Sequence, residues 1–419
     1  MDSPVRQHSL REHNLALVLR RVATNPRPLS RADVAAATGL TRATVSTLVD
    51  DLVAGGLLAE LEPVPRAGVG RPATGLALSP HGPCGLGLEI NVDYLAACVT
   101  DLSGTVRHQI VRHVDQRDRP AGDALAAVAE LAAEAAAVAA DEGLPVAGAA
   151  LAVPGLVRQN PHGGGHVHVA PNLGWRDVPV PAALGALTLR VENEANLAAL
   201  GELQAGEQDP DVSPSFIYVS GEVGIGAGIV LDGQLYRGAH GWSGEFGHLT
   251  IDANGPRCHC GARGCLEQYA GQDAILRAAG VAGEDAVPAG LERIQRLAQA
   301  ADPAMLAALG AAGAALGIAL AGAVNLLDVD AVVLGGSYAP LAPRLRAAVE
   351  EELTTRVITA GWSPAEVRAS ALGPEATVVG AAGSVVRDVL AHPAAWLATL
   401  LRPSQPDQSE YGQDEGTKP

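Results

Sequence analysis

Two segments of this 419-residue chain share one plan, although about 130 residues separate them. The first, "LGLEINVDYLAACVTDLSGTV", begins at Leu86 and contains two strand-like stretches around a short turn. The second, "FIYVSGEVGIGAGIVLDGQLYRG", begins at Phe216 and contains an Asp-Gly hairpin turn. Two similar hairpins, each opening an α/β half, predict a duplicated fold with a small-ligand cleft between its halves.

The remaining patterns place the boundaries of this core. Residues 121–142 have helical periodicity and fit the first half. We expect a first lobe over residues 84–190, a second lobe over residues 191–376, and a C-terminal helix at about 377–397 that packs back on the first lobe. The polar, proline-rich residues 403–419 are expected to be disordered.

One apolar stretch, residues 307–327, is uncharged and long enough to span a bilayer. It consists mostly of alanine and glycine and leads directly into a strand-like segment, so we interpret it as a close-packed buried helix. The polar opening residues predict no signal peptide. Five unevenly spaced cysteines argue against a disulfide framework and favour a reducing cytoplasm.

Charge separates the first 80 residues from the rest. They contain nine arginines against seven acidic residues, whereas the whole chain has a net charge of −17. A strongly acidic body would repel nucleic acid, so the slightly basic N-terminal part is expected to have a separate task.

Residues 1–80 match a winged helix-turn-helix domain. Ser30 and Asp33 have capping-box spacing at the start of one short helix, Gly39 follows its end, and Thr41 caps a second helix. Polar or basic side chains on this second helix are expected to meet DNA: Arg42, Thr44, Ser46 and Thr47. Two strand-like pieces then flank a loop with Arg66 and Arg71, which is typical of a wing that enters the minor groove. The alternative is a helical hairpin used only for dimerisation.

Three of the five cysteines lie within "RCHCGARGCLE", residues 257–267. Cys258, Cys260 and Cys265 supply three thiolates, and tetrahedral zinc needs a fourth ligand. His248 and His259 are candidates, although His259 lies between two cysteines, where its side chain is expected to point away. We interpret a second histidine group, "HGGGHVH" at residues 162–168, as a surface loop in preference to another metal site.

Four motifs together resemble the ROK family, which groups sugar-responsive repressors with sugar kinases: "VENEANLAALGE", "GAHGWSGEFGHLTI", "CHCGARGCLEQYA" and "APNLGW". The resemblance spans about residues 10–395, and the winged module matches the xylose-repressor-like branch. It implies an α/β fold, a duplicated actin-like or RNase H-like two-lobed sugar-binding core, behind the winged domain. It also implies a structural Zn²⁺ site in the second lobe with four ligands: His248, Cys258, Cys260 and Cys265.

The same resemblance implies which residues contact the sugar: Asn172, Asn193, Glu194, Glu245, His248 and Glu267. Glu194 stands where the family's kinases have an aspartate base, and its extra methylene displaces the carboxylate. The segment "EINVD" (Glu89–Asp93) lacks the glycines of a phosphate-binding turn, and "SGEVGIGAG" (220–228) departs from the expected Thr-Gly. We therefore expect no kinase activity.

The expected protein is a cytoplasmic, sugar-responsive transcriptional regulator without a membrane partner. It would repress carbohydrate-utilisation genes until a free sugar such as xylose or glucose releases it from a double-stranded DNA operator. A homodimer or a dimer of dimers would match paired half-sites. Two alternatives remain: an ATP-dependent sugar kinase with a DNA-binding head, and a repressor controlled by a protein partner.

Overall fold

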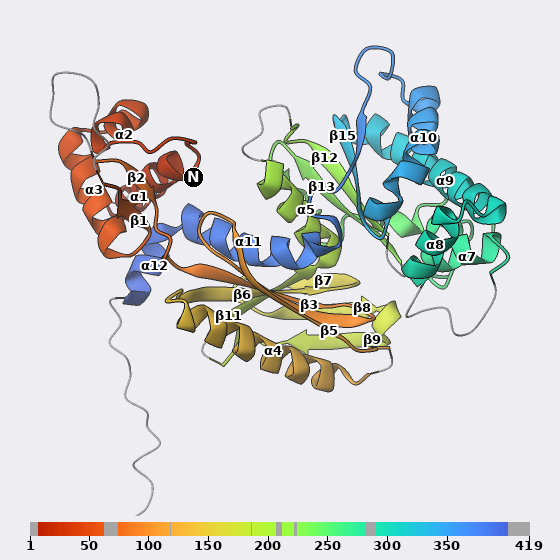
Figure 1. Cartoon of the computed structure of the whole chain (residues 1–419), viewed down its shortest axis with the longest axis horizontal. Coiled ribbons are helices and arrows are strands. Elements are labelled where there is room, and N and C mark those ends of the chain that lie inside the picture. Colours follow the sequence, from red (N-terminus) through yellow and green to blue (C-terminus); the bar gives the residue numbers. More distant parts are fainter. Residues whose placement is uncertain are drawn as a thin grey trace, which may run out of the picture. The chain divides into compact units, whose positions relative to one another are not determined.

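The computed structural model describes residues 7–62, 74–117, 119–185, 187–206, 212–221, 224–281 and 290–400 (Figure 1). The chain divides into two compact units, one of residues 1–79 with 389–419 and one of residues 80–388. The expected wing arginines, Arg66 and Arg71, and the tail 403–419 lie outside the described residues.

Three helices build most of the smaller unit: α1 (Gln7–Ala23), α2 (Arg31–Thr38) and α3 (Arg42–Ala54). Ser30 and Asp33 form the expected capping box, and Gly39 ends α2 in the left-handed conformation with φ 72°. The Thr41 hydroxyl accepts the N–H of Thr44 and so caps α3. The helices share a core of buried aliphatic side chains: Leu15, Leu19, Val34, Val45, Leu48 and Leu52.

Two short strands, β1 (Leu58–Glu60) and β2 (Leu76–Leu78), pair antiparallel in this unit. An isolated bridge between Leu29 and Leu76 adds the segment before α2 to this pair. These strands are the pieces expected on either side of the wing.

The C-terminal helix differs from the expected one at about 377–397. The structure has two helices, α11 (Ala376–Ala391) and α12 (Pro393–Leu400). Pro393 has no N–H to continue α11 and disfavours a helical conformation at His392, so the chain breaks there. Only α11 packs on the first lobe; α12 packs in the smaller unit, where Trp396 Nε1 donates to the Gly55 carbonyl at 3.0 Å.

The first lobe of the larger unit contains a six-stranded sheet in the order β10-β11-β6-β3-β4-β5 (Figure 1). Its strands are β3 (Cys84–Ile90), β4 (Tyr94–Thr100), β5 (Val106–His113), β6 (Val146–Val153), β10 (Ala183–Leu184) and β11 (Leu187–Asn193). Helix α4 (Ala121–Asp141) covers one face, as its periodicity predicts. Helix α11 lies so close to the other face that a Cβ at Gly85 would be 2.1 Å from the Ala382 carbonyl oxygen.

The second lobe repeats this plan in the order β14-β13-β12-β15-β16. Its strands are β12 (Phe216–Gly221), β13 (Ile225–Leu231), β14 (Gln234–Leu235), β15 (Ala331–Gly336) and β16 (Glu366–Ala369). In both lobes an antiparallel three-strand meander is extended by parallel strands, so the duplication expected from the two hairpins is confirmed. The expected Asp-Gly turn is Asp232–Gly233, with φ 50° and 72°, between β13 and β14.

The boundary between the lobes lies a few residues later than expected. Strand β11 pairs with β6 as far as Asn193, so residues 191–193 belong to the first sheet. Helix α5 (Glu194–Gly206) follows at once and packs against β13. The second lobe also contains helices α6 (Glu267–Ala270), α7 (Gln272–Ala278), α8 (Gly290–Gln299), α9 (Pro303–Leu327) and α10 (Tyr338–Arg356).

Helix α9 contains the apolar stretch that is long enough to span a bilayer. Among the described helices it alone has that length and hydropathy, and 61% of its most apolar window is buried inside the protein. A Cβ at Gly317 would lie 2.6 Å from the Glu352 Cβ of α10, so its small residues allow close helix packing. This agrees with the interpretation of 307–327 as a buried helix.

A small antiparallel sheet, β7-β8-β9, was not expected from the sequence. It consists of β7 (Leu156–Gln159), β8 (Gly165–Ala170) and β9 (Trp175–Val180). The interpretation of residues 162–168 as a surface loop was therefore wrong from Gly165 onward. Three glycines hid the strand. Gly163 and Gly164 form the turn before it, with φ 97° and 65°, and Gly165 is its first residue.

Candidate functional site

The four proposed metal ligands converge in the second lobe. Ligand atoms of His248, Cys258, Cys260 and Cys265 all lie within 4.8 Å of one another. His248 Nδ1 is 3.8 Å from Cys258 Sγ, and the Sγ atoms of Cys260 and Cys265 are 3.7 Å apart. Tetrahedral zinc with bonds of about 2.3 Å separates its sulfur ligands by about 3.8 Å. The donor set therefore fits a four-coordinate zinc ion.

The backbone between these cysteines turns tightly. Gly261 has φ 96°, and its N–H donates to the Cys258 carbonyl at 3.0 Å. Gly264 has φ 65°, and a Cβ there would lie 1.6 Å from the Asp252 carbonyl oxygen. Glycine is required at both positions for the sulfur atoms to meet.

The thiols of this cluster have different electrostatic surroundings. Burial and the neighbouring thiols raise the pKa of Cys265 to about 12, whereas the main-chain N–H of Ala262 lowers the pKa of Cys260. Zinc binds thiolates, so metal uptake must release protons here and is favoured by rising pH.

Side chains from both lobes approach Gly224, the residue before β13. A Cβ at Gly224 would lie 3.1 Å from Glu267 Oε2 and 3.2 Å from Asn172 Nδ2. Asn172 belongs to the short 3-10 helix Pro171–Leu173 after β8, and Glu267 opens α6. The structure thus brings together two of the residues that the sequence predicted.

Glu245 and His248 belong to the same group. Glu245 precedes the 3-10 helix Phe246–His248, which His248 ends, just after the loop that follows β14. The Glu245 side chain is exposed as a whole, yet desolvation of its carboxyl raises its pKa; His248 opposes this increase and Glu267 adds to it. Carboxylates, an amide and an imidazole close together are suited to hydrogen-bonding several hydroxyls.

The metal cluster and this polar group are connected through the backbone. The N–H of Leu266 donates to the Leu249 carbonyl at 2.9 Å, which joins the residues next to Glu267 and His248. His248 presents Nδ1 to Cys258, so its Nε2 remains for a second partner. His248 can therefore belong both to the metal-ligand cluster and to the polar group next to Gly224.

Asn193 and Glu194 lie at the junction of β11 and α5. The Asn193 side-chain oxygen accepts the N–H groups of Ala195 and Asn196 at 2.9 and 3.3 Å, and its Nδ2 donates to the Gly155 carbonyl. Asn193 therefore caps α5 and keeps one amide hydrogen for another partner. Glu194 is the first residue of α5 and is half-buried.

Glu192 is a polar residue that the sequence analysis missed. Its side chain is only 4% exposed and accepts hydrogen bonds from Gln159, Asn196 and Arg237, the last at 2.8 Å. The pair of Glu192 with Arg237 joins the first sheet to the loop after β14. The motif "VENEAN" contained this residue, but only the fold shows that its partner comes from the second lobe.

The proposed DNA-reading side chains lie in the first turns of α3. Arg42 and Thr47 are exposed, whereas Thr44 and Ser46 are half-buried. The Thr44 hydroxyl pairs with that of Thr41 at 2.9 Å. Arg31 of α2 donates to the Ser46 carbonyl and pairs with Asp50 and Glu60, which fixes α2 against α3.

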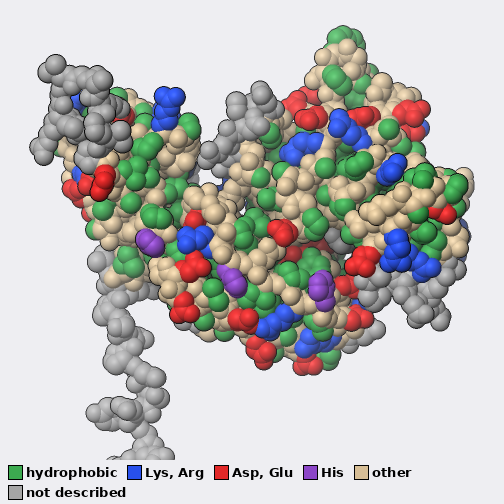
Figure 2. Space-filling model, in the orientation of Figure 1, with side chains coloured by type: hydrophobic (Ala, Val, Ile, Leu, Met, Phe, Trp, Pro, Cys, Tyr) green, Lys and Arg blue, Asp and Glu red, His purple; other side chains and the backbone are tan. Residues whose placement is uncertain are grey.

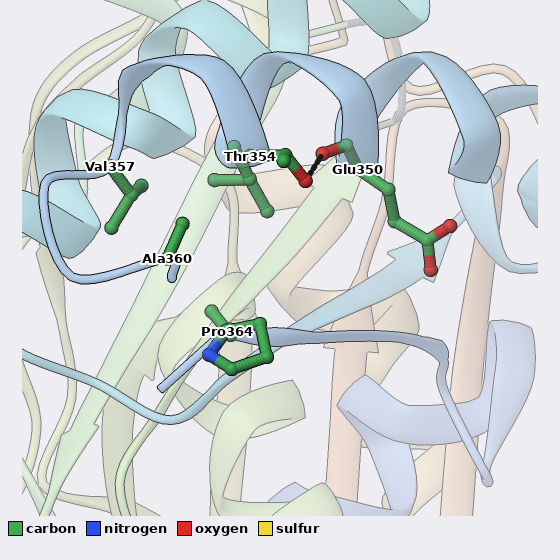
Figure 3. A pocket seen from close by; sticks show the side chains of 7 residues that line it. Glu350, Thr354, Val357, Ala360 and Pro364 are labelled. Carbon is green, nitrogen blue, oxygen red and sulfur yellow. Dashed lines mark hydrogen bonds between the residues drawn. The ribbon is translucent and has the colours of Figure 1, made fainter. Parts of the chain in front are cut away.

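The larger unit has an acidic exterior. Figure 2 shows Asp and Glu side chains spread over the face turned to the viewer, with arginines among them. A pocket on the second lobe, at the end of α10, is lined by Glu350, Leu353, Thr354, Val357, Ala360, Pro364 and Ala365 (Figure 3). None of the predicted site residues lines it.

Two family models match this chain. A model described as "ROK family" matches residues 85–387. The chain belongs to the ROK family. A MarR family model matches residues 16–68 of this ROK protein, which is most of its winged unit. Both matches confirm what the sequence motifs predicted.

Regulators and kinases both resemble this ROK protein. The "Xylose repressor" of Bacillus subtilis (strain 168) is 30% identical over 383 residues, covering 91% of this chain and 96% of that protein. The crystal structure of a ROK family transcriptional regulator, a homologue of the E. coli MLC protein, has a TM-score of 0.75 and 26% identity over 93% of this chain and 99% of that chain. A ROK family glucokinase from Streptomyces griseus, in complex with glucose and AMPPNP, has a TM-score of 0.59 and 28% identity, covering 72% of this chain and 98% of that chain.

In this ROK protein the turn after β3 is closed on itself. The Asn91 side-chain oxygen accepts the N–H of Val92 at 2.7 Å, and the N–H of Asn91 donates to the Tyr94 carbonyl. The Glu89 carboxylate is buried beneath the turn and accepts hydrogen bonds from Tyr94 and Asn91. The main-chain N–H groups of Asn91 and Val92 thus both have partners within the turn.

The glycines of the second lobe also have structural roles. A Cβ at Gly228 would lie 2.4 Å from the Ala199 Cβ, so this glycine lets α5 approach β13. A Cβ at Gly335 would lie 2.0 Å from the Tyr218 ring, and the N–H of Gly336 donates to the Tyr218 hydroxyl. Close packing against Ala199 and Tyr218 therefore excludes a side chain at Gly228 and Gly335.

Proposed function

We propose that this ROK protein is a sugar-responsive transcriptional repressor that binds double-stranded operator DNA and is released by a free sugar. The observation that carries the proposal is the convergence of Asn172 and Glu267 on Gly224, in a chain that also contains a winged helix-turn-helix. Relatives named as xylose repressors make xylose the first sugar to test and glucose the second.

In this proposal the sugar lies against Asn172, Asn193, Glu194, Glu245, His248 and Glu267. Each carboxylate accepts from two hydroxyls, which distinguishes stereoisomers more strongly than apolar walls do. Sugar binding shifts DNA affinity only if it favours one arrangement of the paired DNA-binding units over another. This requires a homodimer or a dimer of dimers.

DNA contacts are assigned to Arg42, Thr44, Ser46 and Thr47 of α3, with Arg66 and Arg71 as wing arginines. Short side chains at the N-terminus of α3 allow the helix backbone to approach the base edges, and arginine supplies the phosphate contacts. A DNA-binding role also assigns the protein to the cytoplasm.

A structural zinc ion in the second lobe completes the proposed site. His248, Cys258, Cys260 and Cys265 would hold it, and four protein ligands leave no position for a reactive water. Its role is to fix the segment that presents His248 and Glu267.

Kinase activity is not part of this proposal. The closed turn at Asn91 uses two main-chain donors for its own contacts, and the Tyr218 ring packs directly against Gly335, which argues against an open phosphate loop at either place. Glu194 also stands where the family's kinases have aspartate.

Operator binding at fixed salt tests the proposal, because phosphate contacts make the affinity salt-dependent. DNA from upstream of the protein's own gene is titrated with and without a panel of aldoses. We expect one aldose to release the protein, and Glu267→Gln to bind DNA normally without being released. The matched control is Glu292→Gln, at an exposed position of α8.

Two outcomes would replace the proposal. Tight DNA binding that no sugar changes, with release by cell extract, would favour a repressor controlled by a protein partner. Sugar-dependent ATP consumption that Glu194→Ala abolishes would restore the kinase interpretation.

A further inference from the structure

Two histidines and an aspartate meet on the small sheet of the first lobe. His166 and His168 are two residues apart on β8 and therefore project from the same face. In the register of β8 and β9, Val167 pairs with Val178 and Val169 with Arg176, which places Asp177 across from His168. His166 Nε2 and His168 Nδ1 lie 3.4 and 3.8 Å from Asp177 Oδ1.

These three side chains have the spacing of metal ligands. One ligand atom from each lies within 4.8 Å of the others, and the two imidazole centroids are 4.7 Å apart. In tetrahedral geometry, bonds of about 2.0–2.2 Å from a metal to nitrogen and oxygen place the ligand atoms about 3.3–3.6 Å apart. The distances of 3.4 and 3.8 Å from the two histidines to Asp177 Oδ1 are close to this range. The side chains are 36%, 32% and 68% exposed for His166, His168 and Asp177, so a cation can reach them from solvent.

The backbone of Asp177 adds an independent observation. Asp177 has φ 52°, a left-handed conformation that is uncommon for a residue other than glycine. Such a conformation is unusual in a strand pair that has only a packing role.

We propose that His166, His168 and Asp177 form a second metal site, for a borderline divalent cation such as Zn²⁺ or Ni²⁺. Imidazole and carboxylate together select such cations over Mg²⁺ and Ca²⁺, which require mostly oxygen ligands. Three protein ligands leave at least one coordination position for water. The site is separate from the Cys3His cluster, which lies on the second lobe.

A cation at this site would fix a contact between the lobes. The His168 ring meets the Trp242 ring edge-on, with centroids 5.3 Å apart, and Trp242 also contacts His240. Trp242 belongs to the second-lobe loop that leads into Glu245, and a Cβ at Gly241 would lie 3.3 Å from the Val157 carbonyl oxygen of β7. Ordering the His168 ring therefore orders this loop against the small sheet.

Titration of the untagged, zinc-loaded full chain with Ni²⁺ tests the proposal by calorimetry. We expect one equivalent of Ni²⁺ per chain beyond the metal of the Cys3His cluster, and no such equivalent in His166→Ala or His168→Ala. Asp177→Asn weakens binding and keeps the fold, since asparagine accepts the left-handed conformation. The matched control is His162→Ala, because His162 is exposed at the preceding turn and outside the cluster.

Tryptophan emission gives a second readout. Bound Ni²⁺ is expected to quench Trp242, so the quenching decreases in Trp242→Phe while the binding equivalent is kept. Retention of the additional equivalent in His166→Ala and His168→Ala would overturn the proposal, as would its absence from the parent protein. Equal loss in His162→Ala would assign the binding to another group.

Discussion

The two lobes repeat one hairpin, but the turns of the equivalent hairpins have different surroundings. In the first lobe the Asn91 side chain binds the N–H of Val92 and also reaches buried Glu89, so the turn is filled by its own residues. In the second lobe Gly224 leaves room into which Asn172 and Glu267 point. The duplicated backbone therefore repeats the strand plan, whereas the side chains next to Asn91 and Gly224 differ, and only those next to Gly224 belong to the proposed sugar site.

The largest effect is expected from loss of the metal proposed for the second lobe. Chelation or Cys260→Ser removes the constraint on His248 and Glu267, so sugar affinity falls at least about tenfold and the thermal unfolding temperature decreases. Calorimetric sugar titration and thermal unfolding measure both. His259→Asn is the control, because His259 lies between two of the cysteines but outside the cluster. Unchanged sugar affinity in the metal-free protein would show that the Cys3His cluster does not support the sugar-binding residues.

In the first lobe, Glu89→Gln tests the closed turn. Burial raises the pKa of Glu89 from 4.5 to about 7, although hydrogen bonds from Tyr94 and Asn91 oppose this. Between these values the folded protein holds more protons than the unfolded chain, so the wild-type stability falls as pH rises through this window. The variant lacks this dependence.

The free energy of unfolding of Glu89→Gln, taken relative to that of the wild type, should increase from about pH 4.5 to pH 7. The total increase is up to about 3 kcal/mol above pH 7. Chemical denaturation across this pH range measures the difference. Parallel pH profiles for the two proteins would show that Glu89 is not the titrating group.

Gly224→Ala tests the space beside Gly224 in the second lobe. The new methyl group would lie 3.1 Å from Glu267 Oε2 and 3.2 Å from Asn172 Nδ2, so it occupies the space of a ligand hydroxyl. We expect sugar affinity to fall about tenfold, or about 1.4 kcal/mol, while operator binding without sugar is unchanged. Gly322→Ala is the control in the same lobe, because nothing lies within 4 Å of the added methyl group. Normal sugar affinity in Gly224→Ala would show that the sugar does not bind beside Gly224.

The smallest effect is expected from Arg117→Ala beside the first turn. Arg117 pairs with Asp93 and Asp115 at 3.1 and 2.9 Å, but its side chain is 28% exposed. Ion pairs near the surface contribute about 0–1 kcal/mol, so stability should change little and sugar affinity not at all. Denaturation and sugar titration check both, and a large loss of sugar affinity would contradict the division of roles between the two turns.

Much of this protein could be predicted because the relevant spacing is short. Ser30, Asp33, Gly39 and Thr41 cap two helices through contacts within four residues, so composition and position suffice. The cluster of Cys258, Cys260 and Cys265 is also nearly contiguous, and two glycines at the turns reveal its tight backbone.

Other features were missed because their partners are distant in the sequence. Nothing near Glu192 indicates that Arg237 pairs with it. Pro393 marks the break between α11 and α12, but nothing near it indicates that Trp396 bonds to Gly55. The small sheet was hidden because two glycines form its first turn, a third glycine opens β8, and its strands contain polar histidines.

The sequence by itself determined the winged helix-turn-helix, the duplicated hairpins and the three cysteines of the Cys3His cluster, because each depends on residue types at short spacing. The resemblance to the ROK family supplied His248 as the fourth ligand. Only the tertiary structure decided that Asn172 and Glu267 meet at Gly224, that tyrosine rings fill the space beside Gly221 and Gly335, and that His168 lies against Trp242. These contacts join residues that are about 45 to 120 positions apart in the sequence. The packing of whole sheets and helices sets the geometry of each contact. Local periodicity does not contain that information.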